Sequence, residues 1–246
     1  MAYSVAVVGA TGRMGTLATR LIEQAPDLEV HALLSSRDTI ETIAGADLVL
    51  DLTLPAVSPT VVDAAIERGL PVLVGTSGWT AERLARVRSR LGEEPATGVI
   101  VIPNFSLGSV LATRLATIAA PYFDSIEIIE AHHAGKSDSP SGTAIRTAEL
   151  IGEARAARGP VAAPHADQRA RGQQVASVPV HSLRMDGVLA EQQVIFGGVG
   201  ETLRVSHQTV SDASYEAGIL LALRALPATR GLVVGLDALL GLDGGA

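Results

Sequence analysis

The most restrictive feature of this 246-residue sequence is the rhythm of its first hundred residues. Short apolar runs rich in β-branched residues alternate with longer stretches in which apolar residues recur at helical spacing. Such alternation is typical of parallel strands joined by crossover helices, so we predict a Rossmann-like, doubly wound α/β sheet. The expected strands are 5–8, 28–33, 47–52, 71–74 and 99–102, and the expected helices are 14–24, 59–68 and 81–91, the last two capped by Ser58 and Thr80.

The rhythm changes after residue 104, and the second half predicts a different, α+β domain. A Gly/Pro/Ala/Arg-rich stretch at 158–174 reads as a surface loop, and glycine-containing turns separate three later strands, which predicts a mixed or antiparallel sheet. A last helix and strand return to the first sheet, so the predicted domains are 1–105 plus 216–246, and 106–215. The expected elements here are helices 110–120, 142–157 and 213–226 and strands 125–130, 178–184, 191–196, 202–207 and 232–234.

Composition narrows the classes of function. The net charge is −7 and no long Lys/Arg run occurs, which argues against nucleic acid or a membrane surface as partner. The sequence has no cysteine, so disulfides, thiolate catalysis and Cys-based metal sites are excluded. No basic, apolar leader opens the sequence and no apolar run approaches the roughly 18 residues of a membrane helix, so we expect a cytoplasmic protein.

A glycine-rich turn lies between the first predicted strand and helix. It reads Gly9-Ala10-Thr11-Gly12-Arg13-Met14-Gly15. Glycines let the backbone approach a pyrophosphate, and a helix N-terminus offers unpaired N–H groups. The spacing is Gly-x-x-Gly-x-x-Gly, not the more usual Gly-x-Gly-x-x-Gly, and a tight turn that binds nothing is the alternative.

Three further segments follow predicted strands of the first sheet. The second strand ends in Leu33-Leu34-Ser35-Ser36-Arg37, with no carboxylate before Asp38. Arg37 suits a ribose 2′-phosphate, which favours NADPH over NADH. The alternative is that Arg37 is a solvated surface arginine. Ligands bind outside the carboxyl ends of strands in such sheets. We therefore expect Gly75-Thr76-Ser77 and Ile102-Pro103-Asn104-Phe105 to line the cofactor, with simple loops as the alternative.

The segment from Glu130 to Ala144 carries the densest chemistry. It contains His132, His133 and Lys136, followed by Ser141-Gly142-Thr143 at the head of a predicted helix. Imidazoles titrate near neutrality, so the histidines can donate protons, and the lysine adds an ammonium group. The backbone N–H groups at the head of the helix can bind an anion beside them. Singly, each residue has a simpler explanation as a solvated side chain or helix cap. A third ligand for a metal is missing, so we expect none.

This string, Glu-x-His-His-x-x-Lys-x-Asp-x-Pro-Ser-Gly-Thr-Ala, resembles the dihydrodipicolinate reductase family, also called 4-hydroxy-tetrahydrodipicolinate reductase, of diaminopimelate and lysine biosynthesis. The resemblance extends over the whole chain, through the glycine turn and the segments near 75, 103, 181–186 and 196–201. The stretch 211–214 lacks the arginine of many relatives, and Ser139 and Ile102 replace the commoner alanines.

The resemblance implies a homotetramer assembled by the second domain and an NAD(P)H-dependent reduction of a small cyclic dicarboxylate with loss of water. It implies that His132 exchanges a proton, that Lys136 is a second acid, and that His133, Gly142 and Thr143 hold the substrate carboxylates. Residues Gly9 to Met14, Gly75 to Ser77 and Ile102 to Phe105 would line the cofactor. Another NAD(P)-dependent oxidoreductase of similar layout and a non-catalytic dinucleotide sensor are the alternatives.

Overall fold

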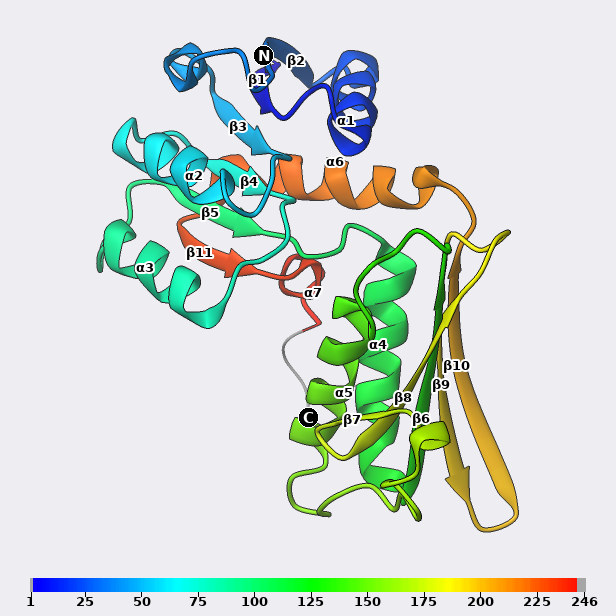
Figure 1. Ribbon diagram of the computed structural model, residues 1–246. Helices are drawn as coiled ribbons and strands as arrows, with labels where there is room; N and C mark the ends of the chain where they lie inside the picture. Colours follow the sequence, from blue (N-terminus) through cyan, green and yellow to red (C-terminus); the bar gives the residue numbers. More distant parts are fainter. Residues whose placement is uncertain (1, 243–246) are drawn as a thin grey trace. The chain divides into compact units, whose positions relative to one another are not determined.

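The computed structural model describes residues 2–242, and the chain packs as two compact units (Figure 1). The first unit contains the described residues up to Ser106 together with those from Tyr215 onwards, and the second is Leu107–Ser214. The predicted domain range 216–246 ends in residues 243–246, which lie outside the described residues. Each unit has its own sheet and its own buried core, so we describe them separately.

The first unit is built on a parallel sheet, which has six strands in the part of the chain that the structure describes. Their order is β11-β5-β4-β3-β1-β2, and every neighbouring pair is parallel. The late strand β11 joins this sheet, as the sequence predicts. The strands are β1 (Tyr3–Val8), β2 (Leu28–Leu34), β3 (Leu48–Asp51), β4 (Val72–Val74), β5 (Gly98–Val101) and β11 (Gly231–Val234).

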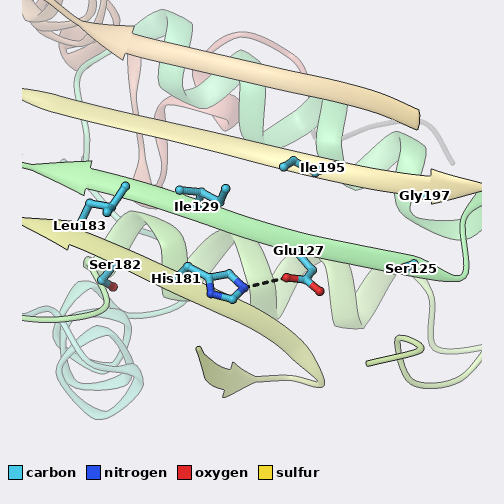
Figure 2. Close-up of a pocket in the computed structure, with 8 residues that line it drawn as sticks. All are labelled: Ser125, Glu127, Ile129, His181, Ser182, Leu183, Ile195 and Gly197. Carbon is cyan, nitrogen blue, oxygen red and sulfur yellow. Dashed lines mark hydrogen bonds and ion pairs between the residues drawn. The ribbon is translucent and has the colours of Figure 1, made fainter. Parts of the chain in front are cut away.

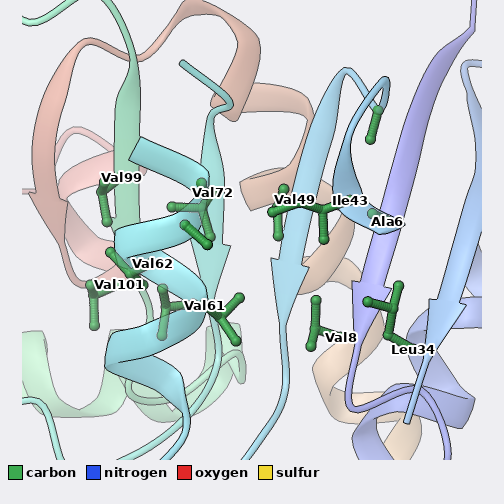
Figure 3. Packing of buried hydrophobic residues seen from close by; sticks show 14 of the residues in the cluster. Ala6, Val8, Leu34, Ile43, Val49, Val61, Val62, Val72, Val99 and Val101 are labelled. Carbon is green, nitrogen blue, oxygen red and sulfur yellow. The ribbon is translucent and has the colours of Figure 1, made fainter. Parts of the chain in front are cut away.

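The helices of the first unit form two groups: α1 contacts α6, and α2 contacts α3. Val61 and Val62 of α2 pack onto strand residues such as Val72 and Val99, all buried (Figure 3). Burial of these β-branched side chains on the sheet is the main force that assembles the unit. The helical elements are α1 (Arg13–Gln24), η1 (Ile40–Ile43), α2 (Ser58–Glu67), α3 (Ala81–Leu91), α6 (Glu216–Ala225), η5 (Leu226–Ala228) and α7 (Leu236–Leu239).

The strand order places a switch point between β1 and β3. After β1 the chain crosses to β2 on one side, and it then returns to β3 on the other side. In sheets of this kind, ligands bind in the crevice outside the carboxyl ends of the strands at such a switch point. The predicted α/β fold with a Rossmann-like sheet is confirmed.

The second unit has a mixed sheet, five-stranded within the described residues, in the order β10-β9-β6-β8-β7. Only β6 and β8 run parallel; the other neighbours are antiparallel. Helices α4 and α5 pack on one face over buried residues such as Ile126, Ile128 and Phe196. The elements are α4 (Leu107–Ala119), η2 (Ala120–Tyr122), β6 (Ser125–His132), α5 (Gly142–Ala154), η3 (Arg169–Arg171), β7 (Gln173–Val175), β8 (Val178–Arg184), β9 (Ala190–Gly198), β10 (Glu201–Thr209) and η4 (Asp212–Tyr215).

The predicted mixed or antiparallel sheet is confirmed as a mixed sheet, in which β6 lies between β8 and β9 and pairs with both. One local prediction is wrong. Ser58 does not cap α2; Val57 is the cap residue, and the Ser58 hydroxyl donates to Asp51 instead. The predicted cap at Thr80 is confirmed, since its hydroxyl accepts from the Arg83 N–H. The expected 158–174 loop contains η3 and the start of β7.

Candidate functional site

The glycine turn after β1 is forced into close contact with the loop after β3. Gly9 has φ +88°, and a Cβ there would lie 2.5 Å from the Leu52 carbonyl oxygen. A Cβ on Gly15 would lie 2.2 Å from the Gly9 carbonyl oxygen. Neither position accommodates a side chain, so the turn exposes backbone at the switch point of the sheet.

The N-terminus of α1 has the properties of an anion site. Gly12 precedes the helix, makes no side-chain cap, and no acidic residue occupies the first turn. The first N–H groups of a helix have no intrahelical acceptor, and the helix dipole adds positive charge there. The residues present therefore fit the pyrophosphate of a dinucleotide, which would lie across Gly9, Ala10, Thr11, Gly12, Arg13 and Met14.

The other predicted cofactor segments lie at neighbouring strand ends. The Gly75 N–H donates to the Asp51 carbonyl at 2.9 Å, and the Ile102 N–H donates to the Val74 carbonyl at 2.8 Å. A Cβ on Gly75 would meet the Phe105 ring at 2.5 Å, so these two segments are in contact. Thr76, Ile102 and Phe105 are buried, Asn104 is half-buried, and Ser77 and Pro103 are exposed.

The end of β2 is attached to the glycine turn. The N–H groups of Gly9 and Ala10 both donate to the Leu34 carbonyl, at 2.9 and 3.0 Å. Beyond Leu34, the Asp38 carboxylate accepts from the Ser35 N–H and hydroxyl at 2.8 and 2.7 Å. This turn leaves the Arg37 side chain exposed, close in sequence to the strand end that is bonded to the glycine turn.

A buried carboxylate that the sequence analysis did not assign lies at the end of β3. Asp51 is fully buried and accepts from the Thr53 N–H at 3.0 Å, from the Thr53 hydroxyl at 2.6 Å, and from the Ser58 hydroxyl. Burial raises the pKa of Asp51, against the opposing hydrogen bonds from Ser58 and Thr53. Asp51 thus holds the loop that packs against Gly9.

In the second unit, His132 ends β6 beside a buried glutamate. Its Nδ1 lies 2.5 Å from Oε2 of Glu130, which is completely buried, while the imidazole is 17% exposed. Burial lowers the pKa of His132, against the opposing effect of Glu130. Burial would raise the pKa of Glu130, but the hydrogen bonds that it receives, from Arg184 above all, outweigh burial and lower that pKa.

Lys136 lies in the loop after β6 and is held by a neighbouring carboxylate. Its Nζ contacts both oxygens of Asp138, at 2.6 and 2.8 Å, and the lysine side chain is 22% exposed. The Lys136 N–H also donates to the His133 carbonyl, which closes the turn. His133 itself is exposed. The loop therefore presents an ammonium group and two imidazoles on one short segment.

The N-terminus of α5 has the free backbone donors that an anion site needs. The Ser141 hydroxyl accepts from the Ala144 N–H, and the Ser141 N–H donates to Oε1 of Glu130. The N–H groups of Gly142 and Thr143, the first two helical residues, have no intrahelical acceptor. Nothing would lie within 4 Å of a Cβ on Gly142, so open space adjoins these donors. The structure thus brings Gly142 and Thr143 next to the strand that carries His132.

Arg184 is the other residue that the sequence analysis left without a role. It lies opposite His132 in the β6–β8 register and donates to both oxygens of Glu130 at 2.9 Å and to the Asp138 carbonyl at 2.6 Å. Its sequence position after a strand-like run and before Asp186-Gly187 gave no signal by itself. Pairing of β8 with β6, which links it to Glu130, is a long-range feature.

A separate pocket lies on the other face of the second sheet (Figure 2). There, Glu127 Oε2 lies 2.7 Å from Nε2 of His181, and Arg171 also contacts the glutamate. Side chains alternate between faces along a strand, so Glu127 and Glu130 point to opposite sides. This pocket therefore does not contain the predicted catalytic residues. Its lining is Ser125, Glu127, Ile129, His181, Ser182, Leu183, Ile195 and Gly197.

Two family models cover nearly all of the chain. "Dihydrodipicolinate reductase, N-terminus" matches residues 3–105, and "Dihydrodipicolinate reductase, C-terminus" matches residues 108–240. The chain belongs to the dihydrodipicolinate reductase family. The predicted resemblance is confirmed, and with it the prediction of an NAD(P)H-dependent oxidoreductase; the alternative classes are not favoured.

Individual relatives in this family match over most of their length. The chain is 61% identical to the 4-hydroxy-tetrahydrodipicolinate reductase of Clavibacter michiganensis over 244 residues, which covers 99% of this chain and 88% of that protein. It is 46% identical to the enzyme of the same name from Streptomyces coelicolor, over 97% of this chain and 98% of that protein.

Solved structures give the same fold. A dipicolinate-bound dihydrodipicolinate reductase from Paenisporosarcina sp. TG-14 matches with a TM-score of 0.82 at 29% identity, over 97% of this chain and 99% of that one. An amine dehydrogenase from Mycobacterium smegmatis matches with a TM-score of 0.63 at 9% identity, over 96% and 95% of the two chains, which shows a shared fold alone. Among the described residues, no helix is long and apolar enough to cross a membrane.

Proposed function

We propose that this chain reduces 4-hydroxy-tetrahydrodipicolinate to tetrahydrodipicolinate in the diaminopimelate and lysine pathway. Hydride from NADPH or NADH replaces the ring hydroxyl, which leaves with one proton as water. The observation that carries this proposal is the cluster of His132, Lys136 and the α5 N-terminus in one site, within a chain of this family. The Paenisporosarcina reductase binds dipicolinate, a dicarboxylate of the expected shape.

The first unit binds the dinucleotide. The uncapped start of α1 holds the pyrophosphate, and the segments at 75–77 and 102–105 line the rest of the cofactor at the strand ends. The nicotinamide, when bound, supplies the hydride. Gly75 and Phe105 pack against each other, so the protein presents this part of the crevice as one preformed surface.

Arg37 gives a preference for NADPH. It lies on the exposed turn that the Leu34 carbonyl ties to Gly9 and Ala10, and a guanidinium binds a 2′-phosphate in a bidentate fork. Asp38 does not offer an equivalent site for a ribose hydroxyl, because its carboxylate is bound to Ser35. Substitution of Arg37 by alanine should raise KM for NADPH and leave KM for NADH nearly unchanged.

The second unit binds and protonates the substrate. One carboxylate accepts from the N–H groups of Gly142 and Thr143, and His133 contacts a carboxylate from the loop side. Addition of hydride pushes electron density into the ring, so an acid has to deliver a proton. His132 donates that proton from Nε2, and the Lys136 ammonium stabilises the developing negative charge.

We further propose that the enzyme is a cytoplasmic homotetramer assembled through the second unit. Among the described residues, neither α4 nor α5 covers the face of the mixed sheet that carries Glu127, Ile129 and His181; these helices cover the other face, and only the short η3 reaches this one, through Arg171. Leu183 is 48% exposed on this face. Sheets rarely leave such a face uncovered, and a second copy is the occupant that we propose. Sedimentation equilibrium tests the assembly; a monomer would contradict it.

The decisive experiment measures oxidation of NADPH and of NADH, with substrate generated freshly from pyruvate and aspartate semialdehyde by the preceding enzyme. Rapid oxidation that depends on this coupling enzyme supports the proposal, and the ratio of rates reports the cofactor preference. Dinucleotide binding without turnover would favour a sensor instead. His132→Gln should lower kcat with little change in KM, whereas Lys136→Ala should damage both; unchanged kinetics in both variants would contradict the assigned roles.

A further inference from the structure

Glu130 is placed to control the orientation of His132. The two residues are separated by one position on β6, so both side chains lie on the same face of the sheet. The hydrogen bond from His132 Nδ1 to Oε2 of Glu130 is 2.5 Å long, and the glutamate is completely buried. An ionised carboxylate only accepts hydrogen bonds, so Nδ1 has to carry the hydrogen and Nε2 is left to exchange a proton.

Arg184 binds Glu130, which in turn binds His132. Its two terminal nitrogens each donate to one oxygen of Glu130, both at 2.9 Å, in the bidentate geometry that gives strong and directional pairing. The Ser141 N–H adds a third donor at 3.2 Å. With these donors, the buried carboxyl group stays ionised despite its burial, because hydrogen bonds and a charge of opposite sign favour the charged form.

The same arginine reaches the loop that carries Lys136. A nitrogen of Arg184 donates to the Asp138 carbonyl at 2.6 Å, and the Asp138 carboxylate binds Lys136. Arg184 therefore connects the end of β6 with the loop that follows it. The charged groups that act on the His132 imidazole are Glu130, Lys136 and Arg184.

We propose that Glu130 and Arg184 are positioning residues for the reduction, with Glu130 fixing Nε2 of His132 as the proton-exchanging atom and Arg184 locking Glu130 and the Lys136 loop in one arrangement. The inference rests on the proposed function for its kinetic consequences only. The imidazole geometry itself is a property of the protein without substrate. During turnover the Nε2–H bond breaks, the proton passes to the substrate, and the imidazole returns to its neutral Nδ1–H form.

The first test is spectroscopic and does not require activity. In protein labelled with 15N-histidine, the His132 signals are identified by their loss in His132→Gln. The wild-type ring should show Nδ1–H at neutral pH, and Glu130→Gln should shift it toward a mixture of both tautomers, since an amide both donates and accepts. An unchanged His132 spectrum in Glu130→Gln would overturn the proposal.

Glu127→Gln is the matched control for this spectrum. Glu127 lies on the same strand and also contacts a histidine and an arginine, but on the opposite face of the sheet. Its replacement should move the His181 signals and leave those of His132 in place. Movement of the His132 signals in both variants would show a general disturbance of β6 and would also overturn the proposal.

The second test is the pH profile of kcat/KM. Glu130→Gln should lower kcat about 100-fold with KM changed less than about threefold, as expected when the orienting carboxylate of a histidine is neutralised. The limb that reports His132 should shift toward acid, because the stabilising negative charge is lost. A rise in KM alone, with kcat and the limb unchanged, would indicate substrate binding by Glu130 and overturn the positioning role.

Arg184→Met and Arg184→Lys separate charge from shape. Methionine removes both the charge and the bidentate geometry of Arg184 and should reduce kcat strongly. Lysine keeps the charge, so it should restore part of the rate and return the limb of the pH profile toward its wild-type position. Equal loss in the two variants would contradict the role of charge that we give to Arg184. If the wild-type enzyme fails to turn over the proposed substrate while the tautomer still depends on Glu130, the proposed function fails and the positioning geometry stands.

Discussion

Asp51 in the first unit and Glu130 in the second are both completely buried carboxylates, yet their surroundings push their pKa values in opposite directions. Asp51 receives hydrogen bonds from the neutral donors Thr53 and Ser58, and burial dominates. Glu130 receives a bidentate arginine and a histidine, and these outweigh burial. Burial alone therefore does not decide the charge of a carboxyl group; the charge of its donors does.

The largest difference in stability should appear when each carboxylate is replaced and its hydrogen-bond donors lose their acceptor. Glu130→Met leaves Arg184 beside an apolar side chain, and we expect a loss of about 3 kcal/mol in the free energy of unfolding of the second unit. This loss is measured by urea unfolding, with hydrogen exchange of the β6 amides as the probe of the second unit. Glu127→Met is the control and should cost clearly less, because Glu127 and Arg171 are each 28% exposed. Equal losses would remove the distinction between buried and exposed pairs.

Asp51→Asn should cost less, about 1 kcal/mol, because neutral hydrogen bonds are rearranged and no charge loses its partner. Trp79 is the single tryptophan of the sequence, and its indole N–H donates to the Ser58 hydroxyl at 3.1 Å. Its fluorescence therefore reports unfolding beside Asp51 directly. We also expect a several-fold rise in KM for the dinucleotide, since Asp51 holds the loop against Gly9. A cost as large as that of Glu130→Met would break the comparison.

The two carboxylates should make opposite contributions to the pH dependence of stability. Asp51 has a raised pKa in the folded state, so its contribution is present below 3.8 and is lost as pH rises through the raised value. Glu130 has a lowered pKa, so its contribution is present above 4.5 and is lost as pH falls through the lowered value. Unfolding of wild type, Asp51→Asn and Glu130→Gln across this acid range should give differences with opposite slopes. Parallel slopes would contradict one assignment.

The smallest effect on stability should come from Asp138→Asn. Asp138 is 56% exposed, so loss of its pair with Lys136 should change the free energy of unfolding by no more than about 0.5 kcal/mol. The variant releases the Lys136 ammonium, and KM for the substrate should change by several-fold in kinetics measured beside the wild type. A stability loss close to that of Glu130→Met would show that exposure does not separate these pairs.

Local patterns were sufficient to predict the first unit. Its strands alternate with helices along the sequence, and each strand pairs with another strand of this alternating pattern. Gly9 and Gly15 signal a turn that tolerates no side chain. The places of the segments at 75–77 and 102–105 follow because parallel strands end at one edge of the sheet; their contact with a cofactor stays a prediction. Ser58 was misjudged as a cap, because a hydroxyl before a helix gives no sign that a buried carboxylate elsewhere will claim it.

The second unit was harder to predict because its key pairings are distant in sequence. Nothing around residue 184 indicates that β8 will pair with β6, and without that pairing Arg184 has no partner. Glu130 is the first residue of the Glu130–Ala144 segment that carries the family resemblance. Its proposed role nevertheless depends on Arg184, 54 residues later. His132, Lys136, Gly142 and Thr143 were found because they lie on one short segment. Their roles remain predictions until the kinetic variants are measured.

The alternation of side chains along β6 limits how this protein can change. Glu130 and His132, at even positions, lie on one face of the strand, and Glu127 and Ile129, at odd positions, lie on the opposite face. Inserting or deleting one residue within the strand would exchange the two sets and would damage both faces at once. Related chains should therefore differ in β6 by substitution only, and changes in length should collect in segments such as 158–172 and the turn at 199–200.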